Sequence, residues 1–348
     1  MAREPRRAAA RGTEAGAAAR ARNPGAPFDA AWVRGARATT PNRSEREATA
    51  RAHEPHRATS GGPDTTGPRS EDRDDARSPG SDAIGLLEVL DLTLLGGDDT
   101  PARVRELCRR ARAPLPSALL RRCRLDLVPR VAAICIHPVF LETATDALAG
   151  TGVRIAAVAG GFPDGLSRLE TRLGEIRACV AAGADEVDVV IARYHALNGD
   201  WRRLHDEVRA FRDAAGDATL KVILAVTELD DPGVVARASA TCLLAGADFL
   251  KTSTGREARP ARLVDGTAML REIRRFERAF GIAAGFKAAG GVGTVAAALA
   301  WRRLADTMIG PPPLDAERFR IGASRLLDAI RASLHDGARA PGPRTEGP

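Results

Sequence analysis

Lysine is rare in this chain, and its three copies are the first residues to consider for chemistry. Of 52 Lys+Arg residues in the 348-residue sequence, only Lys221, Lys251 and Lys287 are lysines, and 49 are arginines. Arginine stays protonated, whereas a desolvated lysine can lose its proton and become a nucleophile. Three lysines could also survive by chance in so arginine-rich a chain, so the local sequence around each one decides its role.

Lys251 and Lys287 both stand where an apolar, strand-like run meets a loop. Lys251 ends the run 247–250 and leads into Thr-Ser-Thr-Gly, and Lys287 occupies the same level in the next such run. Two ammonium groups on adjacent strands repel each other, so we expect one of them to be deprotonated near neutral pH. A neutral amine can attack a carbonyl to form a Schiff base. The pair therefore predicts a nucleophile beside a proton donor.

Asp188 is the third ionisable residue that the sequence singles out. It lies in the run 183–191, and strand alternation points it away from the valines on either side. A carboxylate among so many apolar residues has to be paired or functional, and a structural acid bonded to a neighbouring backbone group or lysine is the alternative. Asp185 and Glu186 precede the strand and look ordinary. Lys221 begins its strand, which would place it at the amino-terminal end of the barrel, opposite the end where the chemistry takes place. This position predicts a structural role.

Small residues in two loops indicate a phosphate site. Gly290 and Gly291 follow the run that holds Lys287, and Gly322 and Ser324 stand near the start of the last helical pattern. Backbone amides at such helix starts can bind a phosphate. Glycine pairs are also common in turns, so each position alone is weak evidence and the two together are stronger.

These residues need a scaffold that brings strand ends together. Eight strand-like runs span 87–95, 132–137, 154–159, 186–191, 220–226, 248–252, 285–288 and 318–321. Helical patterns between and after them span 101–113, 166–182, 201–215, 232–245, 261–280, 294–304 and 324–334. This alternation predicts an α/β protein with a (β/α)8 TIM barrel, whose chemistry sits at the carboxyl ends of the strands. A doubly wound open sheet is the alternative, but no GxGxxG motif follows the first strand.

The amino-terminal region differs from the rest in composition. Residues 1–82 contain no leucine and hold 15 arginines against 12 acidic residues, a net charge of +3. Such a segment cannot bury enough apolar surface to offset the entropy of ordering, so we expect a disordered N-terminal extension. Its interleaved charges argue against a nucleic-acid or membrane arm. The predicted organisation is this extension over 1–82, a (β/α)8 barrel over 83–336 and a flexible tail over 337–348.

Composition excludes several classes of protein. No stretch approaches the length of a membrane span, and the start of the chain has no apolar signal core. The five cysteines form no CxxC pair, which favours free thiols in a cytoplasmic setting and gives no zinc-ligand spacing. Aromatic residues make up 4% of the chain, so stacking surfaces for nucleic acid are poorly supplied. No metal and no cofactor are expected.

Taken together, the motifs resemble the deoxyribose-phosphate aldolase family of Schiff-base (class I) aldolases. Beyond the segments of Asp188, Lys251 and Lys287, the resemblance rests on the segments 91–93, 133–138, 161–165 and 320–324, and it spans about 86–334. It implies that Lys251 forms the Schiff base, that Lys287 tunes Lys251 and moves protons, and that Asp188 shuttles protons through a bound water.

The resemblance also implies a substrate, a binding site and an assembly. The reaction would be the reversible cleavage of 2-deoxy-D-ribose 5-phosphate to D-glyceraldehyde 3-phosphate and acetaldehyde, without a metal, in a cytoplasmic homodimer or homotetramer. Small phosphorylated sugars and aldehydes are then the expected partners. The residues expected to bind the substrate are Asp91, Thr93, Cys135, Thr252, Thr254 and Gly255, and those expected to bind its phosphate are Gly290, Gly291, Gly322 and Ser324.

The chain departs from the family pattern at three positions. Gly293 stands where relatives usually have an arginine near the phosphate, Ala225 where they have a glutamate, and Asp164 where they have a histidine. None of these removes a catalytic group, and Arg256 could replace the missing arginine. Two alternatives stay open, which are a related Schiff-base aldolase for another phosphorylated sugar and a catalytically silent phosphosugar-binding barrel.

Overall fold

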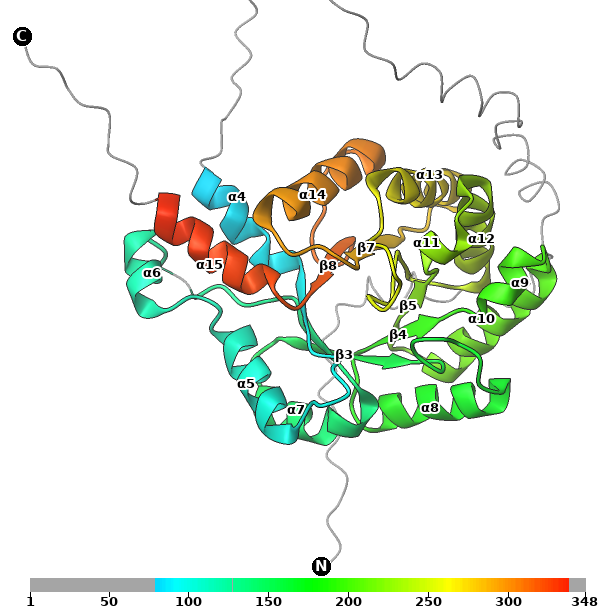
Figure 1. The fold of residues 1–348 in the computed structure, drawn as a ribbon, viewed down its shortest axis with the longest axis horizontal. Helices are drawn as coiled ribbons and strands as arrows, with labels where there is room; N and C mark the ends of the chain where they lie inside the picture. The colour runs from blue at the N-terminus through cyan, green and yellow to red at the C-terminus, as the bar shows by residue number, and fades with distance from the viewer. Residues whose placement is uncertain (1–78, 127, 338–348) are drawn as a thin grey trace, which may run out of the picture.

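Eight parallel strands close into a barrel in the computed structural model, which describes residues 79–126 and 128–337 (Figure 1). The strands follow chain order, and β1 pairs with both β2 and β8, which closes the ring. The strands are β1 Leu90–Thr93, β2 Ala133–Ile136, β3 Arg154–Ala159, β4 Glu186–Val190, β5 Thr219–Ile223, β6 Phe249–Lys251, β7 Gly285–Ala289 and β8 Phe319–Ala323. The predicted TIM barrel is confirmed.

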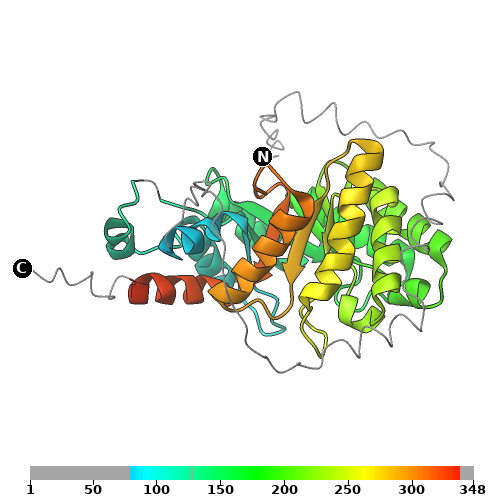
Figure 2. The same ribbon diagram turned by 90° about the horizontal axis from the view of Figure 1, so that it is seen from above.

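Helices surround the strands on the outside (Figures 1 and 2). The longer ones are α5 Pro101–Arg112, α7 Leu141–Leu148, α8 Leu169–Ala181, α10 Trp201–Ala215, α12 Pro232–Ala245, α13 Leu263–Phe280, α14 Val295–Ile309 and α15 Leu326–Gly337. The shorter ones are α4 Pro79–Gly85, α6 Ser117–Arg122, α9 Arg193–Leu197 and α11 Val226–Leu229. None of the described helices is long and apolar enough to cross a membrane.

The described residues begin with α4, which packs against α15 beside it (Figure 1). Residues 79–82, which we predict to belong to the disordered extension, are instead the first residues of this helix. The predicted disorder of 1–82 and the predicted tail of 337–348 fall almost wholly outside the described residues. Both stay predictions from composition.

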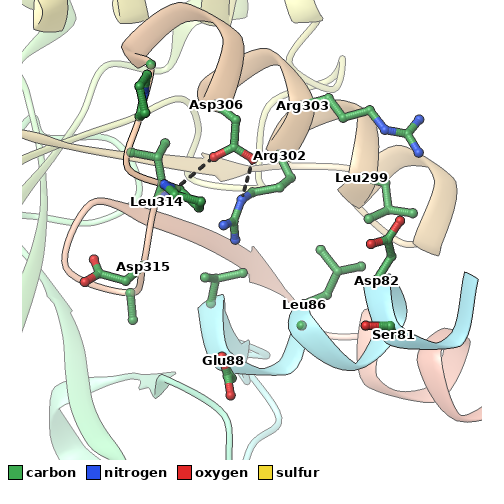
Figure 3. Close-up of a pocket in the computed structure, with 16 residues that line it drawn as sticks. Ser81, Asp82, Leu86, Glu88, Leu299, Arg302, Arg303, Asp306, Leu314 and Asp315 are labelled. Atoms are coloured by element: carbon green, nitrogen blue, oxygen red, sulfur yellow. Dashed lines mark hydrogen bonds and ion pairs between the residues drawn. The ribbon is translucent and has the colours of Figure 1, made fainter. Parts of the chain in front are cut away.

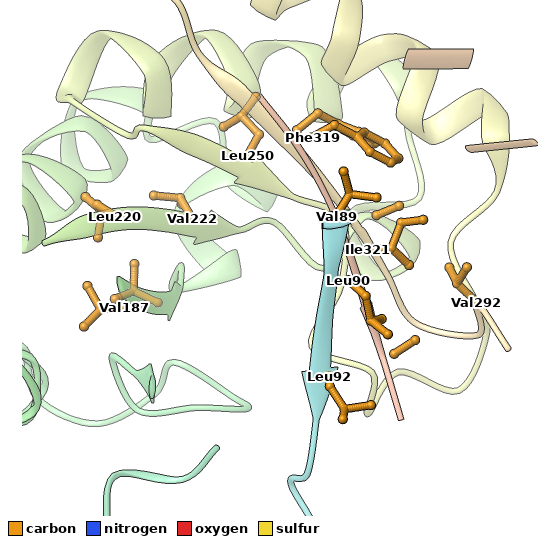
Figure 4. Packing of buried hydrophobic residues seen from close by; sticks show 14 of the residues in the cluster. Val89, Leu90, Leu92, Val187, Leu220, Val222, Leu250, Val292, Phe319 and Ile321 are labelled. Atoms are coloured by element: carbon orange, nitrogen blue, oxygen red, sulfur yellow. The ribbon is translucent and has the colours of Figure 1, made fainter. Parts of the chain in front are cut away.

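The apolar core lies between the strands and the helices, and the barrel interior is of a different kind. Val187, Leu220, Val222, Leu250 and Ile321 belong to the apolar cluster on the outside of the strands (Figure 4). Successive side chains of a strand point to opposite faces, so the residues between these apolar positions point into the barrel. The interior positions include charged side chains on six strands, namely Asp91, Glu186, Asp188, Lys221, Lys251, Lys287 and Arg320.

Candidate active site

Asp188 is the centre of a buried ion cluster inside the barrel. Its Oδ2 accepts hydrogen bonds from Lys251 Nζ at 2.7 Å and from Lys287 Nζ at 2.8 Å, and its Oδ1 accepts one from Lys221 Nζ at 2.8 Å. The strand register explains this arrangement, because Asp188 pairs with Lys221 across β4 and β5, and Lys251 pairs with Lys287 across β6 and β7. Three amines therefore share one carboxylate.

Two further carboxylates and an arginine complete the cluster. Lys287 also donates to Asp91, and Lys221 also donates to Glu186. Arg320 joins these two acids, with Nη1 at 2.7 Å from Asp91 Oδ1 and Nη2 at 2.8 Å from Glu186 Oε1. All seven side chains are at most 3% exposed. With every group ionised, four cations face three carboxylates, so the cluster has one positive charge in excess.

The pKa values of the cluster follow from a competition between burial and charge. Burial raises the pKa of Asp188, but the charges of Lys221, Lys251 and Lys287 outweigh burial and hold that pKa well below its usual value. Burial lowers the pKa of Lys287, but Asp188 and Asp91 outweigh it and raise that pKa above the usual value. Lys287 therefore stays an ammonium at neutral pH, as expected for a proton donor next to Lys251.

The structure corrects two expectations about this cluster. Lys221 does not lie at the far end of the barrel, because β5 begins at Thr219 and its third residue, Lys221, comes level with Asp188. Glu186 is not an ordinary residue before the strand. It is the first residue of β4, it is fully buried, and it bonds to Lys221 and Arg320.

Sequence reasoning assigns Arg320 no role, although this residue belongs to the segment 320–324 that supports the resemblance. A signal was present, because this arginine stands between two apolar residues, Phe319 and Ile321, within a strand-like run. A charged residue in that position has to be buried with partners or point to the barrel interior. The partners could not be identified, because Asp91 and Glu186 lie 229 and 134 residues away along the chain.

A cavity of about 430 Å³ opens above the cluster at the carboxyl ends of the strands. Of the three lysines, only Lys251 lines it. The structure brings eight of the predicted site residues to this cavity, namely Thr93, Lys251, Thr254, Gly255, Gly290, Gly291, Gly322 and Ser324. Lys251 therefore joins the open cavity to the closed cluster beneath it.

The remaining predicted site residues do not line the cavity. Asp188, Lys287 and Asp91 belong to the buried cluster, and Cys135 Sγ lies 3.8 Å from Asp188 Oδ2. The hydroxyl of Thr252 donates to the carbonyl of Ala289 at 2.9 Å and accepts from its amide at 3.0 Å, so this side chain ties β6 to β7.

The glycine pair after β7 has a backbone conformation in which any other residue would be strained. Gly290 has φ +81° and Gly291 has φ +85°, in the left-handed region that favours glycine. A Cβ on Gly290 would lie 2.9 Å from Ser253 Cβ, and a Cβ on Gly291 would lie 2.6 Å from Pro260 Cβ. The pair therefore allows the backbone to border the cavity closely. The start of α15 borders the same cavity through Ser324, and a helix start favours anions.

The three departures from the family pattern lie in different surroundings. Gly293 lines the cavity, as does Arg256, whose guanidinium donates to the carbonyl of Leu95. Ala225 is buried after β5 with φ 52°, and it does not line the cavity. Asp164 is mostly exposed and lies 3.8 Å from Arg193. Only the glycine at position 293 changes the cavity wall directly.

A second hollow, of about 720 Å³, lies at the opposite end of the barrel (Figure 3). It is bordered by α4, by α14 and by the loop that precedes β8. Within it, Asp306 accepts from Arg302 Nε at 2.8 Å and from the amide of Leu314 at 3.2 Å. None of the three lysines lines this hollow. The nucleophile and its acids therefore favour the cavity above Lys251 as the active site.

Comparison with protein families gives a match over nearly the whole barrel. The family described as DeoC/LacD family aldolase matches residues 87–328. The deoxyribose-phosphate aldolase of Homo sapiens is 44% identical over 255 residues, which cover 72% of this chain and 80% of the relative. The enzyme of the same name from Bos taurus is 43% identical over the same shares of the two chains.

Solved structures give a consistent result. The tetrameric deoxyribose phosphate aldolase of Aeropyrum pernix is 25% identical, with a TM-score of 0.53 over 72% of this chain and 91% of that chain. A crystal structure from Toxoplasma gondii ME49 reaches a TM-score of 0.64 at 23% identity, over 74% of this chain and 95% of that chain. The second likeness supports the fold alone.

Proposed function

Because this chain belongs to the DeoC/LacD family of aldolases, we propose that it cleaves 2-deoxy-D-ribose 5-phosphate reversibly into D-glyceraldehyde 3-phosphate and acetaldehyde. One observation carries this proposal. Lys251 lines the cavity, and its Nζ lies 2.7 Å from a carboxylate oxygen of Asp188 that it shares with Lys287. A nucleophile that lines the cavity is thus in direct contact with a buried proton acceptor, which in turn contacts a buried proton donor.

The first half of the reaction uses Lys251. Its nitrogen, once it has given up its proton, attacks the aldehyde carbon C1 of the open-chain sugar, and the resulting carbinolamine loses water to give an iminium. The C2–C3 bond then breaks, and its electrons move to the iminium nitrogen, which leaves an enamine on Lys251. The iminium supplies the electron withdrawal that this cleavage needs, so the proposal requires no metal and no cofactor.

The second half uses Asp188 and Lys287. The proton of the C3 hydroxyl leaves through a water to this pair as D-glyceraldehyde 3-phosphate forms, and the pair returns a proton to the enamine carbon. A water molecule then hydrolyses the iminium, which releases acetaldehyde and restores Lys251. The contact of both groups at 2.8 Å supports this exchange of protons within one hydrogen-bonded unit.

The position of the bound phosphate determines which carbon of the sugar lies next to Lys251. The backbone of Gly290 and Gly291 and the start of α15 at Ser324 border the same cavity as the lysine. Backbone amides and a helix start stabilise a dianion, and an anchored phosphate holds C1 close to the amine. We assign the phosphate to this side of the cavity.

Reductive trapping tests the proposal. The protein is incubated with deoxyribose 5-phosphate or acetaldehyde, reduced with borohydride, and digested for mass spectrometry. The expected result is a single adduct on Lys251, and the assignment is simple because the chain holds only three lysines. An adduct on Lys221 or Lys287, or none at all, would refute the mechanism.

The matched control is Lys251→Arg. This variant keeps the charge next to Asp188 but has no nucleophilic amine, so it should retain the fold and lose both adduct and turnover. Circular dichroism checks the fold. Turnover of deoxyribose 5-phosphate by this variant at more than about a thousandth of the wild-type rate would contradict the role of Lys251.

Assembly and location form a separate part of the proposal. We infer a homodimer or homotetramer that works in the cytoplasm without nucleic-acid or membrane partners. The tetrameric relative from Aeropyrum pernix and the five free cysteines support this inference. Sedimentation velocity at micromolar concentration tests it, and a monomer at every concentration would contradict the assembly.

A further inference from the structure

Three arginines line the cavity above Lys251, and two of them already have partners. Arg103 lies 2.8 Å from Asp98 Oδ2 and 3.3 Å from Asp99 Oδ1. Arg256 donates to the carbonyl of Leu95. The guanidinium of the third, Arg325, has no hydrogen-bond or ion-pair partner within residues 79–126 and 128–337. It is thus the cation of the cavity wall that a ligand can engage without breaking an existing contact.

The position of Arg325 depends on a neighbour that has no side chain. A Cβ on Gly293 would lie 3.9 Å from both Nε and Nη2 of Arg325, so the guanidinium stands directly beside this glycine. Gly293 does not have a positive φ, which means that its backbone does not require glycine. What the glycine provides is room, because a long side chain there would compete with Arg325 for the same part of the cavity.

The chemistry of this corner suits a phosphate ester. Arg325 directly follows Ser324 and precedes α15, so the guanidinium and the helix start lie together. The Gly290-Gly291 turn borders the same cavity. A guanidinium presents a planar fork of N–H donors that matches two phosphate oxygens, and such charge-assisted bonds are about twice as strong as neutral ones.

We propose that Arg325 binds the substrate's phosphate in the space that Gly293 leaves free, and so sets the preference for phosphorylated over unphosphorylated substrates. This inference rests on the proposed aldolase function. Relatives usually have an arginine at position 293, where this chain has a glycine. On this proposal Arg325, and not Arg256, takes the place of that arginine. Lys251 bonds the carbonyl end of the sugar and Arg325 holds the other end.

The test compares Arg325→Gln with two matched variants. Arg325→Gln should raise the KM for deoxyribose 5-phosphate about 10- to 100-fold with little change in kcat, because a charged hydrogen bond is lost from binding. Arg325→Lys should recover part of the loss, since the charge remains and the fork does not. Arg105→Gln, an exposed arginine on α5 away from the cavity, should leave the KM unchanged.

Acetaldehyde and inorganic phosphate separate this role from a general loss of structure. Acetaldehyde has no phosphate, so borohydride trapping of acetaldehyde on Lys251 should proceed equally in wild type and Arg325→Gln. Inorganic phosphate should inhibit wild-type turnover competitively and should inhibit the variant at least about tenfold less strongly.

Each failure points to a different claim. If wild type traps no aldehyde on Lys251, the proposed function fails. If wild type traps it but Arg325→Gln leaves the KM and the phosphate inhibition constant unchanged, the role of Arg325 is overturned. The same conclusion follows if Arg256→Gln produces the larger rise in KM, or if Arg325→Gln slows the trapping of acetaldehyde as much as it slows turnover.

Discussion

At the scale of single residues, the three lysines differ in how many carboxylates hold them. Lys221 has three carboxylate groups within 4.0 Å, Lys287 has two and Lys251 has one. Lys251 is also the lysine that lines the cavity. The amine with the weakest electrostatic hold is therefore the one that can meet a substrate, and the other two hold the carboxylate in place.

Substituting two of these lysines by methionine should separate activity from stability. Lys251→Met should abolish turnover and cost little free energy of unfolding, because Asp188 keeps two other amine partners. Lys221→Met should lower the free energy of unfolding by about 3–5 kcal/mol, because it breaks the buried ion pairs with three carboxylates. Urea denaturation and steady-state kinetics measure the two quantities. Equal destabilisation by both variants would contradict this division of roles.

The cluster also predicts how stability depends on pH. Although burial raises the pKa of Asp188, Glu186 and Asp91, neighbouring cations hold all three pKa values below normal. Their contribution is present above the unfolded-state pKa of about 4 and is lost as the pH falls further. The pKa of Lys287 is raised, so its contribution is present below about pH 10.4 and is lost above it.

Thermal unfolding at a series of pH values provides the measurement. The Tm should stay nearly constant between about pH 5 and 9 and fall steeply below about pH 4. In Asp188→Asn the whole curve should lie lower, and its fall in acid should be smaller, because one carboxylate no longer titrates. A wild-type Tm that is the same at pH 3 and at pH 6 would contradict the prediction.

At the scale of helices and strands, much of the fold could be predicted from sequence periodicity. The bounds of β3, α10 and α12 are as expected, and all eight strands lie where the apolar runs indicated. The helices α4, α6, α7, α9 and α11 were not predicted. The partners of Lys221, Glu186 and Arg320 could not be predicted either, because they depend on how strands are paired around the ring. Strand alternation shows which face a side chain takes but not how far along the barrel it lies.

Lys251 and Lys287 were easier to single out from the sequence than the buried charges that surround them, and the reason is physical. Lys251 is the last residue of β6 and Lys287 lies two residues before the end of β7, and each strand leads into a loop of small or polar residues. Arg320 shows only as a single charge between two apolar residues, and Glu186 follows Asp185 at the start of β4, where a charge looks ordinary. Arg325 gave no signal in the sequence, because its place beside Gly293 depends on the approach of two loops that are joined only through α14 and β8.

The glycine turn after β7 allows a prediction about stability at this scale. Gly291→Ala should lower the free energy of unfolding by about 1–3 kcal/mol, because its φ is +85° and its Cβ would meet Pro260. It should also raise the KM for the phosphorylated substrate. Gly293→Ala is the matched control and should change stability by less than about 0.5 kcal/mol. Chemical denaturation checks both, and a Gly293→Ala variant less stable than Gly291→Ala would contradict the assignment.

At the scale of the whole molecule, the residues that the structure describes form a closed barrel that begins with α4. β1 pairs with β8, and α4 packs against α14 and α15, the helices before and after β8. Ala83 in α4 is fully buried, and Ile84 packs against the apolar core. The boundary of the stable unit should therefore lie just before α4 and not after it.

Two truncations test this boundary. Removal of residues 1–78 should leave kcat/KM within about twofold of wild type, because that segment has too few apolar residues to contribute to a core. Removal of residues 1–85 should lower the free energy of unfolding by about 2 kcal/mol or more, because it uncovers apolar side chains at the barrel seam. Activity and thermal unfolding of the two truncated chains give the answer. A large loss of activity on removing 1–78 would show that the segment has a role.

The ion cluster also affects how variants of this enzyme behave in a living cell. On the proposed mechanism, the side chains that carry out the chemistry belong to the cluster that fills the middle of the barrel, so a substitution there changes the amount of folded protein as well as its turnover. A loss of a few kcal/mol exposes more chains to chaperones and proteases and lowers the steady-state level several-fold. An inactive variant at Asp188 would then appear scarce in a lysate. Its catalytic defect has to be measured per folded molecule, whereas a variant at Arg325 can be compared directly.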